Sequence, residues 1–239
     1  MVNIPKVDPK KLGQKNRPSE IWDRRAKGNH QDCVKIMSAI SETIVREFLE
    51  TSGFLVQQGR KFVAPSRRHD SHIDFFASHP ASTESKAALP FELQPADLKH
   101  IRRAVFAVKG WHTETFSPAV MANSPEIFRF AQPAAAKAAE AVFGADTVFL
   151  KILVAPSLPS SKKLRRESVE YLRGKGVDGV IEFPAVLSAV IDAVEKNRNY
   201  QRSDVLQLIR VLKAHGMLRE RQMELFRAAK PRATRKPKP

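Results

Sequence analysis

The sequence predicts an α/β domain with a central mixed β-sheet that is flanked by helices. Two apolar runs, 103–111 and 147–155, are typical of buried strands. After the first of these runs, helical and strand-like segments alternate along the chain. Such alternation indicates strands joined by right-handed crossovers, with helices on both faces of the sheet.

The first half of the chain is expected to hold one helix and three strands. The expected bounds are 32–52 for the helix and 54–64, 72–78 and 103–111 for the strands. Apolar residues recur in the helix at three- and four-residue intervals, and Gly53 should end it. Gly59 is expected to form a turn or a bulge. The segment 79–100 has the composition of a loop, with a helical turn near 96–100.

The second half of the chain is expected to alternate helices and strands and to end with two helices. Ser124 and Pro125 should begin a helix that Pro133 kinks or splits and that Gly144 ends. The later segments expected are a strand over 147–155, a helix from Ser160 or Ser161 to Arg173, a strand over 179–183, and helices over 184–196 and 203–215.

The charge of the chain divides it into three parts. We expect a basic arm over 1–29, one α/β domain over 30–216 and a basic disordered tail over 217–239. The formal net charge is +16, and residues 227–239 contain six Lys or Arg and no acid. Basic segments of this kind bind phosphate through counterion release, which favours nucleic acid, with DNA as the expected type. A solubilising tail, or one that binds an acidic protein, is the alternative.

Basic residues outside the arm extend the expected nucleic-acid contacts. The expected contact residues are Arg67 and Arg68, then Lys162, Lys163, Arg165 and Arg166 at the start of a helix, and Arg232, Arg235 and Lys236 in the tail. Positive side chains at a helix N-terminus oppose the helix dipole, so an anionic partner would compensate them.

Composition excludes several classes of protein. No apolar run is long enough for a transmembrane helix, the N-terminus does not have the pattern of a secretory signal, and the tail has no apolar membrane anchor. Cys33 is the one cysteine of the chain, so no disulfide framework is expected. We therefore expect a cytoplasmic location. Nucleotide-binding glycine loops and the Gly-x-Ser-x-Gly elbow are absent from the sequence.

Three residues stand in the order of a metal-dependent nuclease site. Glu42 lies on the first expected helix, Asp74 on the second strand and Lys109 at the end of the third. With Gly53-Phe54 at the end of the helix, this order resembles the PD-(D/E)xK, or restriction-endonuclease-like, nuclease superfamily, in particular its resolvase-like and Mrr-like branches. The resemblance covers roughly residues 32–156. It implies that Glu42 and Asp74 hold Mg²⁺ and that Lys109 orients or deprotonates a water.

The sequence departs from that superfamily at Ala107, where the resemblance would place a carboxylate. A methyl group cannot bind Mg²⁺, so three interpretations remain open. The first is an active Mg²⁺-dependent endodeoxyribonuclease whose missing acid has moved to Glu126 or Glu114. The second is an inactive nuclease-like domain that binds nucleic acid in DNA metabolism or in defence against foreign DNA. The third is that the resemblance is false and the strands are ordinary parts of a hydrophobic core.

Two further alternatives concern partners and small sites. A non-enzymatic subunit of a larger assembly would use the apolar helices over 184–215 to dock a protein partner, and a homodimer is a related alternative. His69, Asp70 and His72 have part of the spacing of a metal site, but no fourth ligand stands at a useful spacing, so a surface loop is the favoured interpretation. Trp111-His112 could stack on a base or form a half-buried strand end.

Overall fold

The structure is a computed structural model that describes residues 39–59, 72–83, 88–110, 112 and 114–218. Several of the residues and segments singled out from the sequence lie outside these described residues. They are the basic arm over 1–29, nearly all of the tail over 217–239 with Arg232, Arg235 and Lys236, and Cys33, Arg67, Arg68, His69, Asp70 and Trp111.

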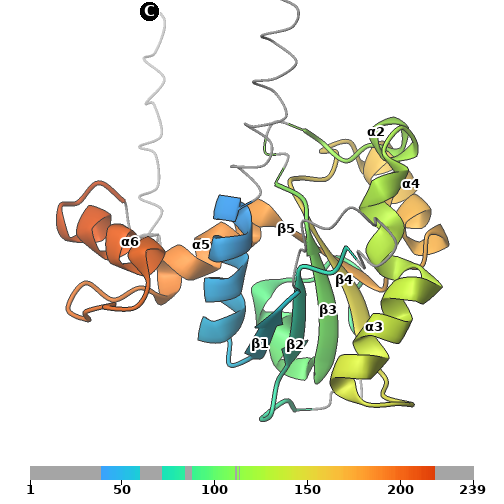
Figure 1. The fold of residues 1–239 in the computed structure, drawn as a ribbon. Coiled ribbons are helices and arrows are strands. Elements are labelled where there is room, and N and C mark those ends of the chain that lie inside the picture. Colours follow the sequence, from blue (N-terminus) through green and yellow to red (C-terminus); the bar gives the residue numbers. More distant parts are fainter. Residues whose placement is uncertain (1–38, 60–71, 84–87, 111, 113, 219–239) are drawn as a thin grey trace, which may run out of the picture.

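The described chain contains one five-stranded sheet with the strand order β1-β2-β3-β4-β5 (Figure 1). The strands are β1 (Leu55–Gln58), β2 (Phe75–Ser78), β3 (Arg103–Val108), β4 (Leu150–Ala155) and β5 (Gly179–Glu182). β1, β2 and β3 pair antiparallel, whereas β3, β4 and β5 pair parallel. The predicted α/β class and the mixed sheet are therefore confirmed.

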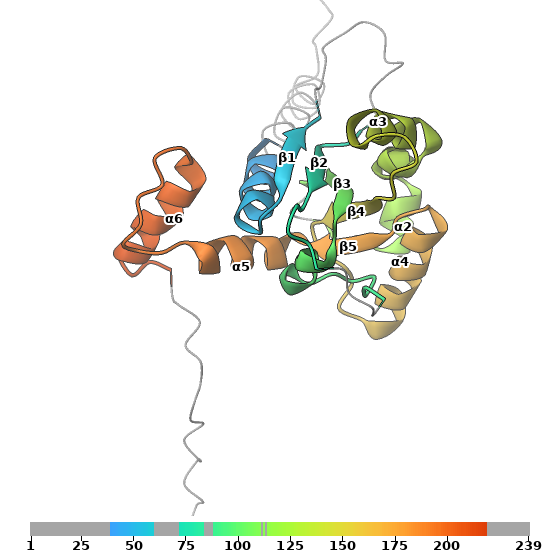
Figure 2. The ribbon, with the colours of Figure 1, turned by 90° about the horizontal axis from the view of Figure 1, so that it is seen from below.

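Helices cover both faces of the sheet. The first helix covers 39–51, and the other described helices are η3 (Pro95–His100), α2 (Pro118–Ala122), η4 (Pro125–Ala131), α3 (Pro133–Phe143), α4 (Lys162–Gly174), α5 (Phe183–Ala193) and α6 (Asp204–Ala214). The 39–51 helix, η3 and α5 pack on one face, and α2, η4, α3 and α4 on the other. Figure 2 shows this division from below, with α6 beyond the sheet at the far end of α5.

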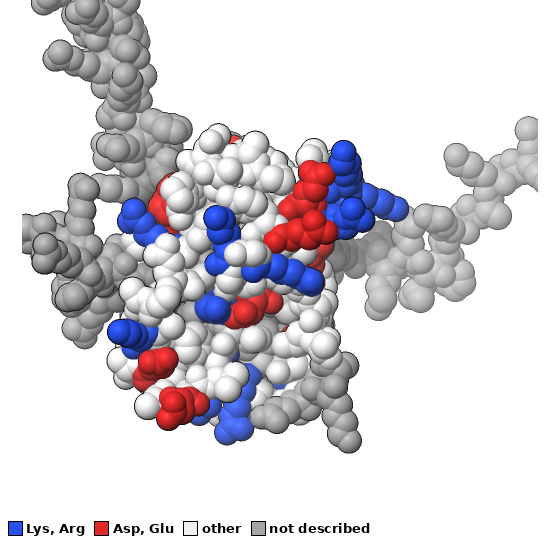
Figure 3. Space-filling model, turned by 90° about the vertical axis from the view of Figure 1, so that its right-hand side faces the viewer, with Lys and Arg blue, Asp and Glu red and all other residues white. Residues whose placement is uncertain are grey.

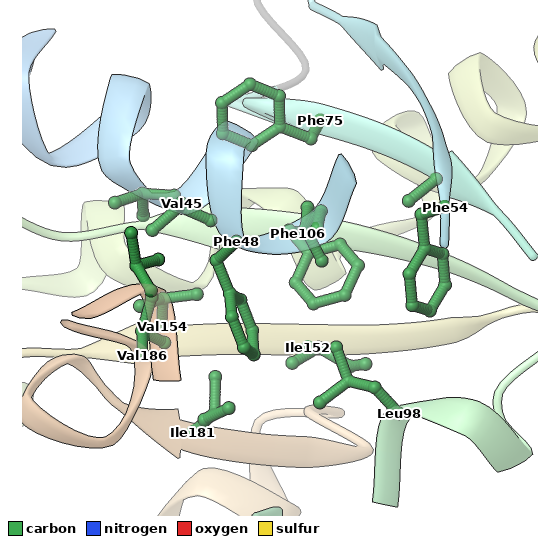
Figure 4. Packing of buried hydrophobic residues seen from close by; sticks show 14 of the residues in the cluster. Val45, Phe48, Phe54, Phe75, Leu98, Phe106, Ile152, Val154, Ile181 and Val186 are labelled. Atoms are coloured by element: carbon green, nitrogen blue, oxygen red, sulfur yellow. The ribbon is translucent and has the colours of Figure 1, made fainter. Parts of the chain in front are cut away.

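The central strand β3 contributes to a hydrophobic core on each face. Phe106 and Val108 face the 39–51 helix and α5, while Val105 and Ala107 face the helices of the other layer. This alternation follows from the two-residue period of a strand. Figure 4 shows Phe106 beside Phe48, with β4 and β5 supplying Ile152 and Ile181 to the same core.

Most expected elements are found with shorter bounds. β1 ends at Gln58, and the N–H of the next residue, Gly59, donates to the carbonyl of Asp74 at 2.8 Å. A Cβ on Gly59 would lie 2.2 Å from the carbonyl oxygen of Ile73, so only glycine fits without a shift. The residues after Gly59 lie outside the described residues until His72.

The second half of the chain differs from expectation in two places. The five-residue helix α2 was not expected; Ser117 caps it by accepting a hydrogen bond from the N–H of Val120. The segment after Ser124 forms the 3₁₀ helix η4, with no hydrogen bond to the Ser124 side chain, and α3 begins at Pro133. The prediction that Ser203 caps the last helix is confirmed, because its hydroxyl accepts from the N–H of Leu206 at 3.2 Å.

Candidate functional site

Asp74 lies where β2 begins and β3 ends. β2 runs antiparallel to β3, so the residue before β2 is at the same edge of the sheet as the end of β3. The N–H of Asp74 donates to the carbonyl of Phe106 at 2.9 Å, and its Oδ2 accepts from the N–H of Val108 at 2.7 Å. Only 5% of Asp74 is exposed, so the carboxylate is part of the buried end of the strand pair.

The two bonds of Asp74 bracket Ala107, the residue that stands where a carboxylate was expected. Phe75 pairs with Phe106, and continuing this antiparallel register by one residue sets Asp74 opposite Ala107. Ala107 is fully buried and belongs to the core on the side of α2, η4 and α3. The structure therefore places Asp74 and the substituted position side by side.

Lys109 and the start of the 39–51 helix lie at the same edge. The N–H of Lys109 donates to the carbonyl of Val154 at 3.1 Å, which extends the pairing of β3 with β4 past the last strand residue. Ser41 Oγ lies 2.7 Å from Nε2 of His112, three residues after Lys109. The ring of His112 also packs on Phe183, with 4.4 Å between the ring centroids.

Glu42, next to Ser41, is 92% buried near this edge. Its helix packs on the opposite face of the sheet from Ala107, because Val45, Phe48 and Leu49 belong to the other core. Within the described part of the chain, no three His, Cys, Asp or Glu side chains form a group that could hold a metal ion. Glu42, Asp74 and Glu126 therefore do not form such a three-ligand group, and their expected role as metal ligands stays a prediction.

The two glutamates considered as replacements for the carboxylate missing at Ala107 lie on different segments. Glu126 is on η4 and is half-buried. Three residues later, Nη1 of Arg129 lies 3.1 Å from Nε2 of His72. Residues three apart in a 3₁₀ helix share a face, so Glu126 lies on the same face of η4 as Arg129. Glu114 is exposed, and its carbonyl accepts a hydrogen bond from the hydroxyl of Ser157 after β4.

The start of α4 carries four cations, of which three are exposed and the fourth, Arg165, is partly buried between two carboxylates. Lys162, Lys163 and Arg166 are exposed, and Arg166 makes a 3.6 Å ion pair with Glu170 one turn later. Figure 3 shows lysine and arginine side chains next to acidic ones on this side of the molecule. This face therefore has mixed charge, and it does not form a continuous basic patch.

Arg165, which is expected to contact phosphate, is paired with two carboxylates in the structure. Its Nε donates to Glu92 at 2.7 Å, and its NH2 group donates to Glu182, the last residue of β5. The hydrogen bond to Glu92 raises the pKa of Arg165, although burial opposes this. Glu182 also accepts from the N–H of Leu158 at 2.9 Å. These bonds connect α4 to the end of β5, beside a pocket of about 240 Å³. The guanidinium of Arg165 therefore already has two carboxylate partners.

Sequence reasoning missed the partners of Arg165 and of His112. Glu92 lies 73 residues from Arg165, and Ser41 lies 71 residues from His112. Contacts at such separations arise from the order of the strands, and no local pattern in the sequence signals them.

The excess positive charge lies mostly outside the described residues. The described part of the chain holds 19 Lys or Arg and 17 Asp or Glu, a net charge of +2 out of +16. Residues 60–71 contain four basic residues and one acidic residue, and they connect Gly59 to His72 at the edge that contains Asp74. The basic residues of 1–38 precede the helix whose Ser41 contacts His112 at that edge. Two basic segments therefore join the described domain at the candidate site.

Comparison of the chain with protein-family models, with curated proteins and with solved structures finds no significant match. Among the described residues, no helix has both the length and the apolar character needed to cross a membrane.

Proposed function

We propose that the protein binds nucleic acid, with DNA as the expected type, along the edge of the sheet where β2 begins and β3 ends. The observation that carries this proposal is the arrangement of charge. The domain itself is nearly neutral, yet the basic segments 1–38 and 60–71 both join it at this edge. Lys109 follows β3 there, and Lys162 and Lys163 begin the helix that follows β4.

Electrostatics favours a phosphate backbone as the ligand. Cations that join a folded body at one edge can neutralise several phosphates of one duplex, and each neutralised phosphate releases a counterion. The ends of parallel strands are also where ligands bind in open α/β sheets. Arg165 is left out of this proposed surface because Glu92 and Glu182 already neutralise it.

The proposed scaffold is a diverged PD-(D/E)xK nuclease fold acting in DNA metabolism or in defence. Support comes from the order helix, three strands, helices and strand, with Glu42 on the helix, Asp74 at the second strand and Lys109 after the third. Ala107 beside Asp74 supports loss of the metal-dependent reaction, because the fully buried methyl group stands where the resemblance requires a ligand.

Fluorescence anisotropy with a labelled DNA duplex, measured over a range of salt concentrations, tests the binding proposal. The edge variant is R67Q/R68Q/K162Q/K163Q. The matched control removes four exposed charges away from this edge, in K99Q/K137Q/K175Q/R198Q. We expect the edge variant to bind more weakly and the slope of log affinity against log salt to shrink by up to about 0.9 for each lost contact. Equal effects of the two variants would contradict binding at this edge.

An active Mg²⁺-dependent endonuclease is the second candidate, and one observation favours it. Arg129 contacts His72 two residues before Asp74, which brings η4 and its Glu126 toward the start of β2. Among the residues that the structure describes, no three His, Cys, Asp or Glu side chains are grouped to hold a metal ion. Cleavage of DNA with Mg²⁺ or Mn²⁺ that Asp74→Ala and Lys109→Ala both abolish would establish this candidate over the binding protein.

A further inference from the structure

Helix α6 has a buried face that fixes it to the end of α5. Leu206 and Ile209 are buried in the core that contains Val190 and Val194 of the α5 region. Lys213 is also buried, and its Nζ donates to the carbonyl of Val194 at 2.7 Å, which satisfies a carbonyl at the end of α5. The orientation of α6 about its own axis is therefore fixed.

The opposite face of α6 carries an exposed row of four residues. Asp204, Leu208, Val211 and His215 are all exposed, although Leu208 and Val211 are large aliphatic residues with 60% and 39% of their surface accessible. Their spacing of four, three and four residues keeps them on one side of a helix. We call these four residues the α6 row. It has an aliphatic centre, an acid at the N-terminal end and a histidine at the C-terminal end.

The α6 row is complementary to itself when a second copy runs antiparallel to it. A two-fold axis midway between Leu208 and Val211 pairs Leu208 with Val211 of the second copy. The same axis pairs Asp204 with His215, because both pairs are centred on the same point of the sequence. A two-fold contact must be complementary to itself in this way. Antiparallel helices also set opposite ends of their dipoles together.

We propose that two copies of this chain associate through an antiparallel contact between their α6 rows. The contact places two Leu–Val pairs at its centre and an Asp–His pair at each end. This inference does not rest on nucleic-acid binding, since the row belongs to α6 and the proposed binding edge does not include it. The two associations also respond to salt in opposite directions. Each copy carries a net charge of +16, so screening favours the dimer, whereas salt weakens binding to phosphate.

Sedimentation equilibrium over about 10 to 1000 µM protein tests the proposal, because a short contact gives a weak dimer. We expect a mass that rises from 26.8 kDa toward twice that value with concentration, and more steeply in high salt. Leu208→Asp should abolish the rise. The control Val148→Asp changes an aliphatic residue that is 87% exposed and lies on another part of the molecule, and it should leave the rise intact.

A charge exchange tests the antiparallel register. Asp204→Lys sets a lysine against His215 of the second copy, and His215→Glu sets a glutamate against Asp204, so either change should weaken the dimer. The double variant D204K/H215E restores opposite charges at both ends and should recover at least the wild-type association. A monomeric wild-type chain at the highest concentration, or a dimer that Leu208→Asp leaves unchanged, would overturn the proposal. Failure of the double variant to recover would overturn the antiparallel register.

Discussion

The carboxylate of Asp74 accepts a hydrogen bond from the backbone N–H of Val108 and so ties the start of β2 to the end of β3. The carboxylate oxygen is the acceptor for this N–H at the point where the regular strand pairing, and with it the main-chain carbonyl acceptors, stops. Asp74 thereby has a structural role at the position where the nuclease resemblance gives it a metal, and the two roles predict different behaviour on substitution.

Replacement of Asp74 separates an acceptor role from a charge role. Asp74→Ala leaves the buried N–H of Val108 without its acceptor and should lower the free energy of unfolding by about 1–3 kcal/mol. Asp74→Asn keeps a side-chain oxygen and should lose less. Urea unfolding followed by circular dichroism measures both values. Equal stability of the Ala and Asn variants would show that this bond does not stabilise the strand pair.

Restoring a carboxylate at Ala107 tests whether its loss removed a metal site. Ala107→Glu would set a second acid beside Asp74, and binding of Mg²⁺ to the folded state should then raise the melting temperature by about 2 °C or more. The isosteric control Ala107→Gln and the wild-type chain should not respond to Mg²⁺. A similar Mg²⁺ response in the wild-type chain would mean that other carboxylates, such as Glu126, already complete a site.

Gly59 should tolerate no side chain. Gly59→Ala places a Cβ 2.2 Å from the carbonyl oxygen of Ile73, so the hairpin must shift at a cost of about 1–3 kcal/mol of unfolding free energy. Gly174→Ala is the matched control, because a Cβ there meets nothing within 4 Å and alanine favours the helical conformation. Thermal unfolding of both variants compares them. A Gly59→Ala protein as stable as Gly174→Ala would refute the close approach.

The parts of the fold that the sequence predicted depend on local patterns, and the parts it missed depend on tertiary contacts. The apolar runs of β3 and β4 and the cap at Ser203 are visible in a few neighbouring residues, and all three are confirmed. Helix α2 is too short for an apolar period to indicate it. The ion pairs of Arg165 arise because α4 returns to the end of β5, so the sequence showed a run of cations without their acids.

For the candidate site, too, local patterns were predicted from the sequence and tertiary contacts were not. The sequence ordered Glu42, Asp74 and Lys109 along the chain, and the topology brings the segments that hold them to one edge of the sheet. It did not foresee that the helix of Glu42 packs on the face opposite to Ala107. The face on which a helix packs depends on the crossover of the chain and on the other helices.

His112 should make stability depend on pH in the mildly acidic range. Burial lowers the pKa of His112 from its ordinary value of 6.5, so the unfolded chain binds a proton more readily than the folded chain. Stability should therefore fall as pH drops below 6.5 toward the lower pKa of the folded state. His112→Gln removes this titration. Melting temperatures at about pH 7.5 and about pH 5.5 should differ less in the variant than in the wild-type chain, and an unchanged difference would assign the dependence to other groups.

Photo-crosslinking to a DNA duplex tests the central claim most directly, because it reports which edge of the sheet the nucleic acid contacts. A photoreactive amino acid replaces Glu114, which is exposed just past the end of β3, or Val148, which is 87% exposed just before β4 begins at the opposite edge. We expect crosslinks from position 114 that decline as salt is raised, and few from position 148. Crosslinks from position 148 that equal or exceed those from position 114, or none from either position, would contradict binding at the edge that contains Asp74 and Lys109.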